Sequence, residues 1–128
     1  MLGKIATKLN VNNDQVGYLF EEDDGELHFV GRRYLPTQKK DAQPAAMLLL
    51  AAGRQAAGVD DFTLVSLGRD LVADLGVIDK NTWIPQVKSL GDLVRRRGEG
   101  SKLAIKLTQA GWDDVRSRVR DALTDKTS

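Results

Sequence analysis

The sequence contains no cysteine, one histidine and few aromatic residues. Without cysteine there are no disulfides and no thiolate metal ligands, which fits a reducing compartment. His28 is the only histidine, and a lone histidine rarely builds a transition-metal site. We therefore interpret His28 as a surface residue, and we expect neither a metal site nor a cofactor.

Long apolar runs are also missing. The longest, residues 45–52, is much shorter than the roughly 20 residues needed to span a bilayer. The first residues lack the apolar core of a signal peptide. We expect a soluble, cytoplasmic protein without membrane contacts, and a length of 128 residues fits a single domain over residues 1–128.

Catalytic motifs are absent as well. The sequence has no nucleophile elbow, HExxH pair, Walker loop or dinucleotide fingerprint. An enzyme would depend on carboxylates and hydroxyls alone, for example a hydrolase that gathers acids from distant segments. We therefore predict a binding protein without catalytic residues, and not an enzyme.

Charge is plentiful but unevenly distributed. The chain has 19 basic and 18 acidic residues, which leaves a net charge of +1. Residues 13–27 carry six acidic and no basic side chains, whereas residues 80–107 carry seven basic and two acidic ones. Such polarity along the chain indicates an electrostatic partner for the basic segment.

The N-terminal segment, residues 1–36, is predicted to hold a short helix and a β-hairpin. Apolar residues alternate near 16–22 and 27–33, on both sides of the pair Asp24-Gly25, which suits a type I′ turn. The acidic run EEDDGE at this turn does not have EF-hand spacing, so we interpret it as a charged turn and not as a metal site.

The rest of the chain, residues 45–123, predicts three helices, a second hairpin and a closing helix. Trp83 and Trp112 lie on apolar stripes of their helices, which favours core packing over base stacking. A loop from Pro36 to Pro44 precedes the first helix. The expected elements are a helix over 45–58, a helix capped by Asp61 or Thr63 that ends at Gly76, a helix over 82–94, strands over 94–97 and 102–107, and a helix after Thr108.

In this order the segments resemble the winged helix-turn-helix superfamily over residues 45–123. The run IKLTQAGWDDV resembles the leucine-threonine-x-x-glycine step of that superfamily, here Leu107, Thr108 and Gly111. The resemblance implies an α+β fold, a winged helix-turn-helix, to which this chain adds an N-terminal β-hairpin. It also implies a recognition helix in the DNA major groove, here residues 82–94, and a wing on the backbone or minor groove, here residues 95–106.

Eight residues are therefore candidate nucleic-acid contacts. Neighbouring residues in a strand point to opposite faces, so Arg95 and Arg97 should share one face and Arg96 the other. The same residue types also occur as solvated helix faces and as protection of sheet edges. The candidates are Gln86, Lys88 and Ser89 on the third helix, and Arg95, Arg96, Arg97, Lys102 and Lys106 in the wing, the two lysines on the second strand with matching parity.

Two functions fit these patterns. The first is a regulator that binds nucleic acid, with double-stranded DNA favoured, as a homodimer that pairs through the N-terminal hairpin and reads two half-sites. The alternative is a protein–protein interaction module on a winged-helix scaffold. Its candidate contacts are the acidic hairpin with Tyr18, Phe20 and Phe29.

Overall fold

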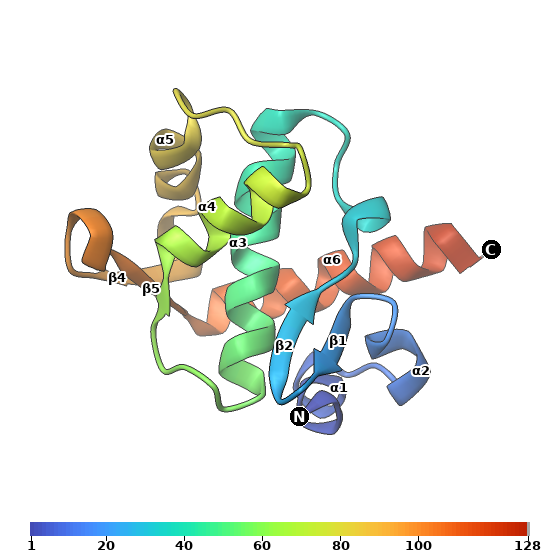
Figure 1. The fold of residues 1–128 in the computed structure, drawn as a ribbon. Coiled ribbons are helices and arrows are strands. Elements are labelled where there is room, and N and C mark those ends of the chain that lie inside the picture. The colour runs from blue at the N-terminus through green and yellow to red at the C-terminus, as the bar shows by residue number, and fades with distance from the viewer. Residues whose placement is uncertain (128) are drawn as a thin grey trace.

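The computed structural model describes residues 1–127, with side chains described through residue 124, and has a mixed α+β fold (Figure 1). Its elements are α1 (Leu2–Leu9), α2 (Asn13–Val16), β1 (Phe20–Asp23), β2 (Glu26–Phe29), η1 (Arg32–Tyr34), α3 (Lys39–Ala56), β3 (Thr63–Leu64), α4 (Val65–Asp74), α5 (Trp83–Lys88), η2 (Gly91–Leu93), β4 (Val94–Arg97), η3 (Gly100–Lys102), β5 (Ala104–Leu107) and α6 (Gln109–Thr127), where η denotes a 3-10 helix. Within residues 1–127, no helix combines the length and the apolar character that crossing a membrane requires.

Helix α3 forms the centre of the core. Residues 45–53 are buried almost without interruption, because apolar or small residues surround the whole helix. Helices α1, α4, α5 and α6 all pack against it, and Figure 1 shows α3 running through the middle of the molecule. Trp83 of α5 is buried, as predicted, whereas Trp112 of α6 is only half-buried.

The prediction of a loop from Pro36 to Pro44 was wrong, because α3 begins at Lys39 and contains Pro44. Proline lacks the N–H that would bond the carbonyl of Lys40, four residues earlier. Lys40 is exposed near the start of the helix, so water can reach that carbonyl. A proline in the second turn is therefore tolerated here.

The first sheet pairs β1 with β2 in antiparallel register. Asp24 and Gly25 connect the strands with φ angles of 52° and 79°, as predicted for this turn. The predicted strand limits were wrong, because residues 13–16 are helical and β2 ends at Phe29. A reciprocal capping box between Asn12 and Gln15 stabilises α2 in place of an extended segment.

Two aromatic residues of this sheet belong to the core. Phe20 and Phe29 lie opposite each other in the register and are buried, with their rings edge to face at a centroid distance of 5.7 Å. Gly53 of α3 leaves room for the Phe20 ring, which a Cβ at that position would overlap. The interpretation of Phe20 and Phe29 as partner contacts was therefore wrong.

The second sheet has the antiparallel order β3-β5-β4. Thr63, predicted as a helix cap, instead lies in β3 opposite Ile105, and α4 begins at Val65. Gln55 of α3 donates hydrogen bonds to the Thr63 hydroxyl (3.1 Å) and the Ile105 carbonyl (3.0 Å). It also accepts one from the Leu107 amide (3.1 Å). This single side chain joins α3 to two strands.

Gln43, near the other end of α3, holds the segment that leads into α5. This fully buried side chain donates to the Thr82 hydroxyl at 3.2 Å and accepts from the Asp79 amide at 3.0 Å. Thr82 lies at the N-terminus of α5, where it was predicted, but its side chain does not cap the helix. The position of α5 therefore depends on a glutamine far away in the sequence.

Candidate nucleic-acid interface

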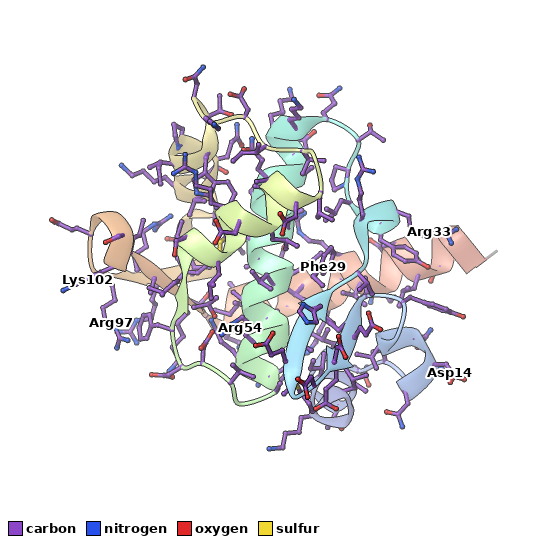
Figure 2. The ribbon with its side chains drawn as sticks, in the orientation of Figure 1. Asp14, Phe29, Arg33, Arg54, Arg97 and Lys102 are labelled. Carbon is purple, nitrogen blue, oxygen red and sulfur yellow. The ribbon has the colours of Figure 1, made fainter. Side chains whose placement is uncertain are left out.

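Strands β4 and β5 form a hairpin, residues 94–107, that we call the basic hairpin. Its register places Arg95 opposite Lys106 and Arg97 opposite Ala104. Arg95, Arg97 and Lys106 therefore share one face of the sheet, and Arg96 lies on the other, as strand parity predicted. Figure 2 shows Arg97 and Lys102 at one side of the molecule and Asp14 at the opposite side.

Lys102 lies at the tip of this hairpin and not in a strand. The predicted strand from residue 102 was wrong, because η3 covers Gly100–Lys102 and β5 begins at Ala104. Gly98 has a φ of 81°, and its Cα faces the Lys102 carbonyl so closely that a Cβ would overlap the oxygen. The resulting tight tip leaves the Lys102 side chain exposed.

The Arg96 side chain is directed toward α5. Its Nη2 donates a hydrogen bond to the Lys88 carbonyl oxygen at 2.9 Å. Lys88 is the last residue of α5, where carbonyl groups lack intrahelical donors. Arg96 thus connects the basic hairpin to α5, and this donor is already engaged.

Helix α5 is shorter than predicted. It ends at Lys88 instead of Val94, because Gly91 adopts a left-handed φ of 53° and the chain passes into η2. Gln86 is half-buried, whereas Lys88 and Ser89 are exposed. The Ser89 hydroxyl donates to the Gln86 carbonyl, so part of its hydrogen-bonding capacity is used within the helix.

Two residues that the sequence reasoning missed lie beside the basic hairpin. The Phe62 ring centroid lies 4.0 Å from Cζ of Arg97 and 5.8 Å from Nζ of Lys106. Nζ of Lys106 also lies 2.8 Å from Oδ1 of Asp61. The Lys106 hydrogen bond, and then its charge, lower the pKa of Asp61 below its ordinary value.

Most cations at this site remain unneutralised. Within residues 1–124, no ion pair involves Lys88, Arg95 or Lys102, while Lys106 pairs with Asp61. Asp92 and Glu99 are exposed nearby in the chain and reduce the net charge. The face that carries Arg95, Arg97 and Lys106 holds these cations against the single carboxylate of Asp61, and this excess of positive charge suits a polyanion.

The leucine-threonine-x-x-glycine step is a structural corner. The Thr108 hydroxyl donates to the Asp92 carbonyl (2.7 Å) and accepts from the Gly111 amide (3.1 Å). The Thr108 amide donates to the Leu93 carbonyl at 3.0 Å. A Cβ at Gly111 would overlap the same carbonyl oxygen, so glycine permits this close approach. The corner fixes α6 against η2, just before the basic hairpin.

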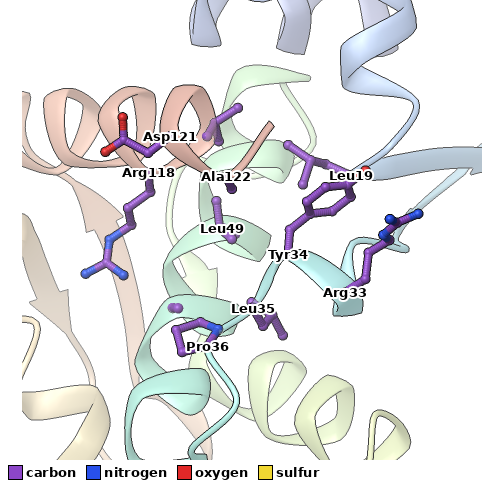
Figure 3. A pocket seen from close by; sticks show the side chains of 11 residues that line it. Leu19, Arg33, Tyr34, Leu35, Pro36, Leu49, Arg118, Asp121 and Ala122 are labelled. Carbon is purple, nitrogen blue, oxygen red and sulfur yellow. The ribbon is translucent and has the colours of Figure 1, made fainter. Parts of the chain in front are cut away.

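A cavity elsewhere is a weaker candidate. It has a volume of about 360 Å³ and lies between η1, α3 and α6, lined mainly by apolar side chains such as Leu35 and Leu49. Its arginines, Arg33 and Arg118, extend away from each other (Figure 3), and Arg118 pairs with Asp114. A ligand site usually has polar groups that converge on the ligand.

Through residue 124, the side chains also form no cluster of metal-ligating groups.

No protein-family model, no curated protein and no solved structure matches the chain significantly.

Proposed function

We propose that the protein is a winged-helix regulator that binds nucleic acid, with double-stranded DNA as the favoured ligand, through the basic hairpin as its wing. The observation that carries the proposal is the exposed cationic set of the basic hairpin, Arg95, Arg97 and Lys102, none of which forms an ion pair among the side chains described through residue 124. Neutralising phosphates with such side chains releases condensed counterions and favours binding.

The topology supports this proposal. Helices α3, α4 and α5 precede the basic hairpin, and the corner at Thr108 leads into α6, which is the order that the winged-helix resemblance implies. Strand β3, between α3 and α4, joins β5 and anchors the hairpin to the helices. In this proposal α5 is the recognition helix, and the β1–β2 pair is the additional N-terminal hairpin.

Backbone contacts contribute more than base contacts in this proposal. Helix α5 has only six residues, and its exposed surface includes Pro85 and Ile84, the latter 42% exposed. These side chains offer no hydrogen bonds to base edges, whereas lysine and arginine bind phosphates of any sequence. Gln86, Lys88 and Ser89 are then secondary contacts.

Fluorescence anisotropy with labelled duplexes of unrelated sequence tests the proposal. We expect similar affinities for all duplexes, and binding that weakens as the salt concentration rises. Joint replacement of Arg95, Arg97 and Lys102 by alanine should abolish most binding. Joint replacement of Lys4, Arg32 and Arg33, three exposed cations outside the hairpin, removes the same charge and serves as control. Absence of wild-type binding, or equal losses in the two triple variants, contradicts the proposal.

A second candidate function is protein docking or homodimerisation through β1 and β2. Tyr18 is 47% exposed beside this sheet, where its ring lies 6.4 Å from that of Tyr34. Within residues 1–127, β1 and β2 pair only with each other, so each has an open edge. Sedimentation equilibrium tests the homodimer, because a monomer at high concentration would contradict pairing through these edges.

A further inference from the structure

The segment just before β3 adds two side chains to the exposed face of the basic hairpin. Asp61 and Phe62 reach this face because β3 pairs with β5, which carries Lys106. The Phe62 ring centroid lies 4.0 Å from Cζ of Arg97, and Oδ1 of Asp61 lies 2.8 Å from Nζ of Lys106. Both cations lie near the Phe62 ring, Arg97 more closely, but only Lys106 also forms an ion pair with Asp61.

The ion pair is open to solvent. The Lys106 side chain is 42% exposed and that of Asp61 is 70% exposed. Ion pairs in such positions are weak, because water and salt compete for both charges. A phosphate that approaches the face can therefore displace the carboxylate from Lys106.

We infer that Asp61 competes with nucleic-acid phosphate for Lys106 and thereby limits the affinity of the basic hairpin. This inference rests on the proposed function, since it concerns the regulation of the same face. When a phosphate takes Lys106, Asp61 loses its partner and remains beside a polyanion, so binding must overcome both effects. Lys106 lowers the pKa of Asp61 from a value already far below neutral, so the competing carboxylate is ionised at neutral pH.

Neighbouring acids do not have this relationship to the face. Asp60 is partly buried and bound to Arg54, which fixes the loop before β3. Glu99 is exposed at the hairpin tip and forms no ion pair with any side chain up to residue 124. Asp61 differs from both because it forms an ion pair with Lys106. Lys106 lies opposite Arg95 in the strand register, so this pair is on the proposed binding face.

The test compares wild type with Asp61→Asn by duplex anisotropy over a salt series. We expect the variant to bind about three- to tenfold more tightly at low salt, with a log–log salt slope steeper by about one, because Asp61 no longer neutralises the charge of Lys106. Asp61→Ser should give the same gain, which guards against an effect of the asparagine amide. Asp14→Asn, an equal charge change on the opposite side of the molecule, should leave the affinity nearly unchanged.

The double variant Asp61→Asn/Lys106→Gln tests the mechanism. Its gain over Lys106→Gln alone should be clearly smaller than the gain of Asp61→Asn over the wild type, because without the lysine only the repulsion between Asp61 and the polyanion is removed. If Asp61→Asn and Asp61→Ser bind as the wild type does, or if the gain is equally large without Lys106, the inference is overturned while the proposed function stands. If the wild type binds no duplex, the proposed function fails and the inference fails with it.

Discussion

Arg96 and Lys88 are joined by a hydrogen bond of 2.9 Å from the Arg96 guanidinium to the Lys88 carbonyl oxygen. The bond connects the side of β4 that faces away from Arg95 to the end of α5. Adjacent arginines in one strand thus have different tasks. Arg96 positions the basic hairpin relative to α5, while Arg95 is exposed on the opposite face, where the proposed function places the nucleic acid.

Separate alanine variants should distinguish these tasks. Arg96→Ala removes a charged hydrogen-bond donor and should lower the free energy of unfolding by about 1 kcal/mol. Arg95→Ala should change it by less than about 0.5 kcal/mol, because Arg95 is exposed, but should weaken duplex binding more than Arg96→Ala does. Urea unfolding and anisotropy measure the two quantities. Identical profiles for the two variants would contradict this division.

Gly111→Ala should destabilise the corner that leads into α6. Its Cβ would overlap the Leu93 carbonyl oxygen, which also accepts the Thr108 amide, so the backbone must shift. We expect a loss of about 1–3 kcal/mol in the free energy of unfolding. Gly3→Ala is the matched control, because Gly3 is also helical and has no atom near its Cβ position. That change should stabilise the chain by about 0.5–1 kcal/mol. Destabilisation by both variants would count against the overlap as the cause.

Gln43→Leu should loosen the segment that precedes α5. The leucine keeps the buried volume but leaves the Asp79 amide without its acceptor and removes the donor to Thr82. Asp79 is half-buried, so we expect a loss toward the lower end of the about 1–3 kcal/mol that a buried polar group without a partner costs. Urea unfolding measures the loss, and faster hydrogen exchange at the Asp79 amide localises it. Gln38→Leu, at an exposed position, is the control. Protection of the Asp79 amide in Gln43→Leu would show that another group satisfies it.

Local patterns predicted much of the fold. The positive φ values at Asp24 and Gly25, the end of α4 before Gly76 and the buried stripe of α6 all follow from turn chemistry or periodicity. The predictions were wrong at α2 and at the start of α3, and the causes are also local. The capping box at Asn12 favours a helix where alternation predicted a strand, and Pro44 is tolerated inside α3 where proline predicted a loop.

The candidate site was less predictable because it depends on pairing between distant segments. The local sequence predicts that Thr63 caps a helix, but pairing with the distant Ile105 places it in a strand. That pairing is also what brings Asp61 and Phe62 to Arg97 and Lys106. Charge and strand parity identified the arginines, but no spacing in the sequence indicated the acid that holds Lys106.

The Asp61–Lys106 pair predicts a specific pH dependence. Lys106 lowers the pKa of Asp61 in the folded chain, so the pair stabilises the fold above the ordinary carboxyl pKa of about 4. The contribution is lost as the pH falls through the lowered pKa. Carbon-detected NMR should find the Asp61 midpoint below that of a free aspartate, and Lys106→Gln should raise it because both the hydrogen bond and the charge are removed. The melting temperatures of wild type and Asp61→Asn should differ slightly at neutral pH and converge in acid. A midpoint that Lys106→Gln does not move would show that the pair is absent in solution.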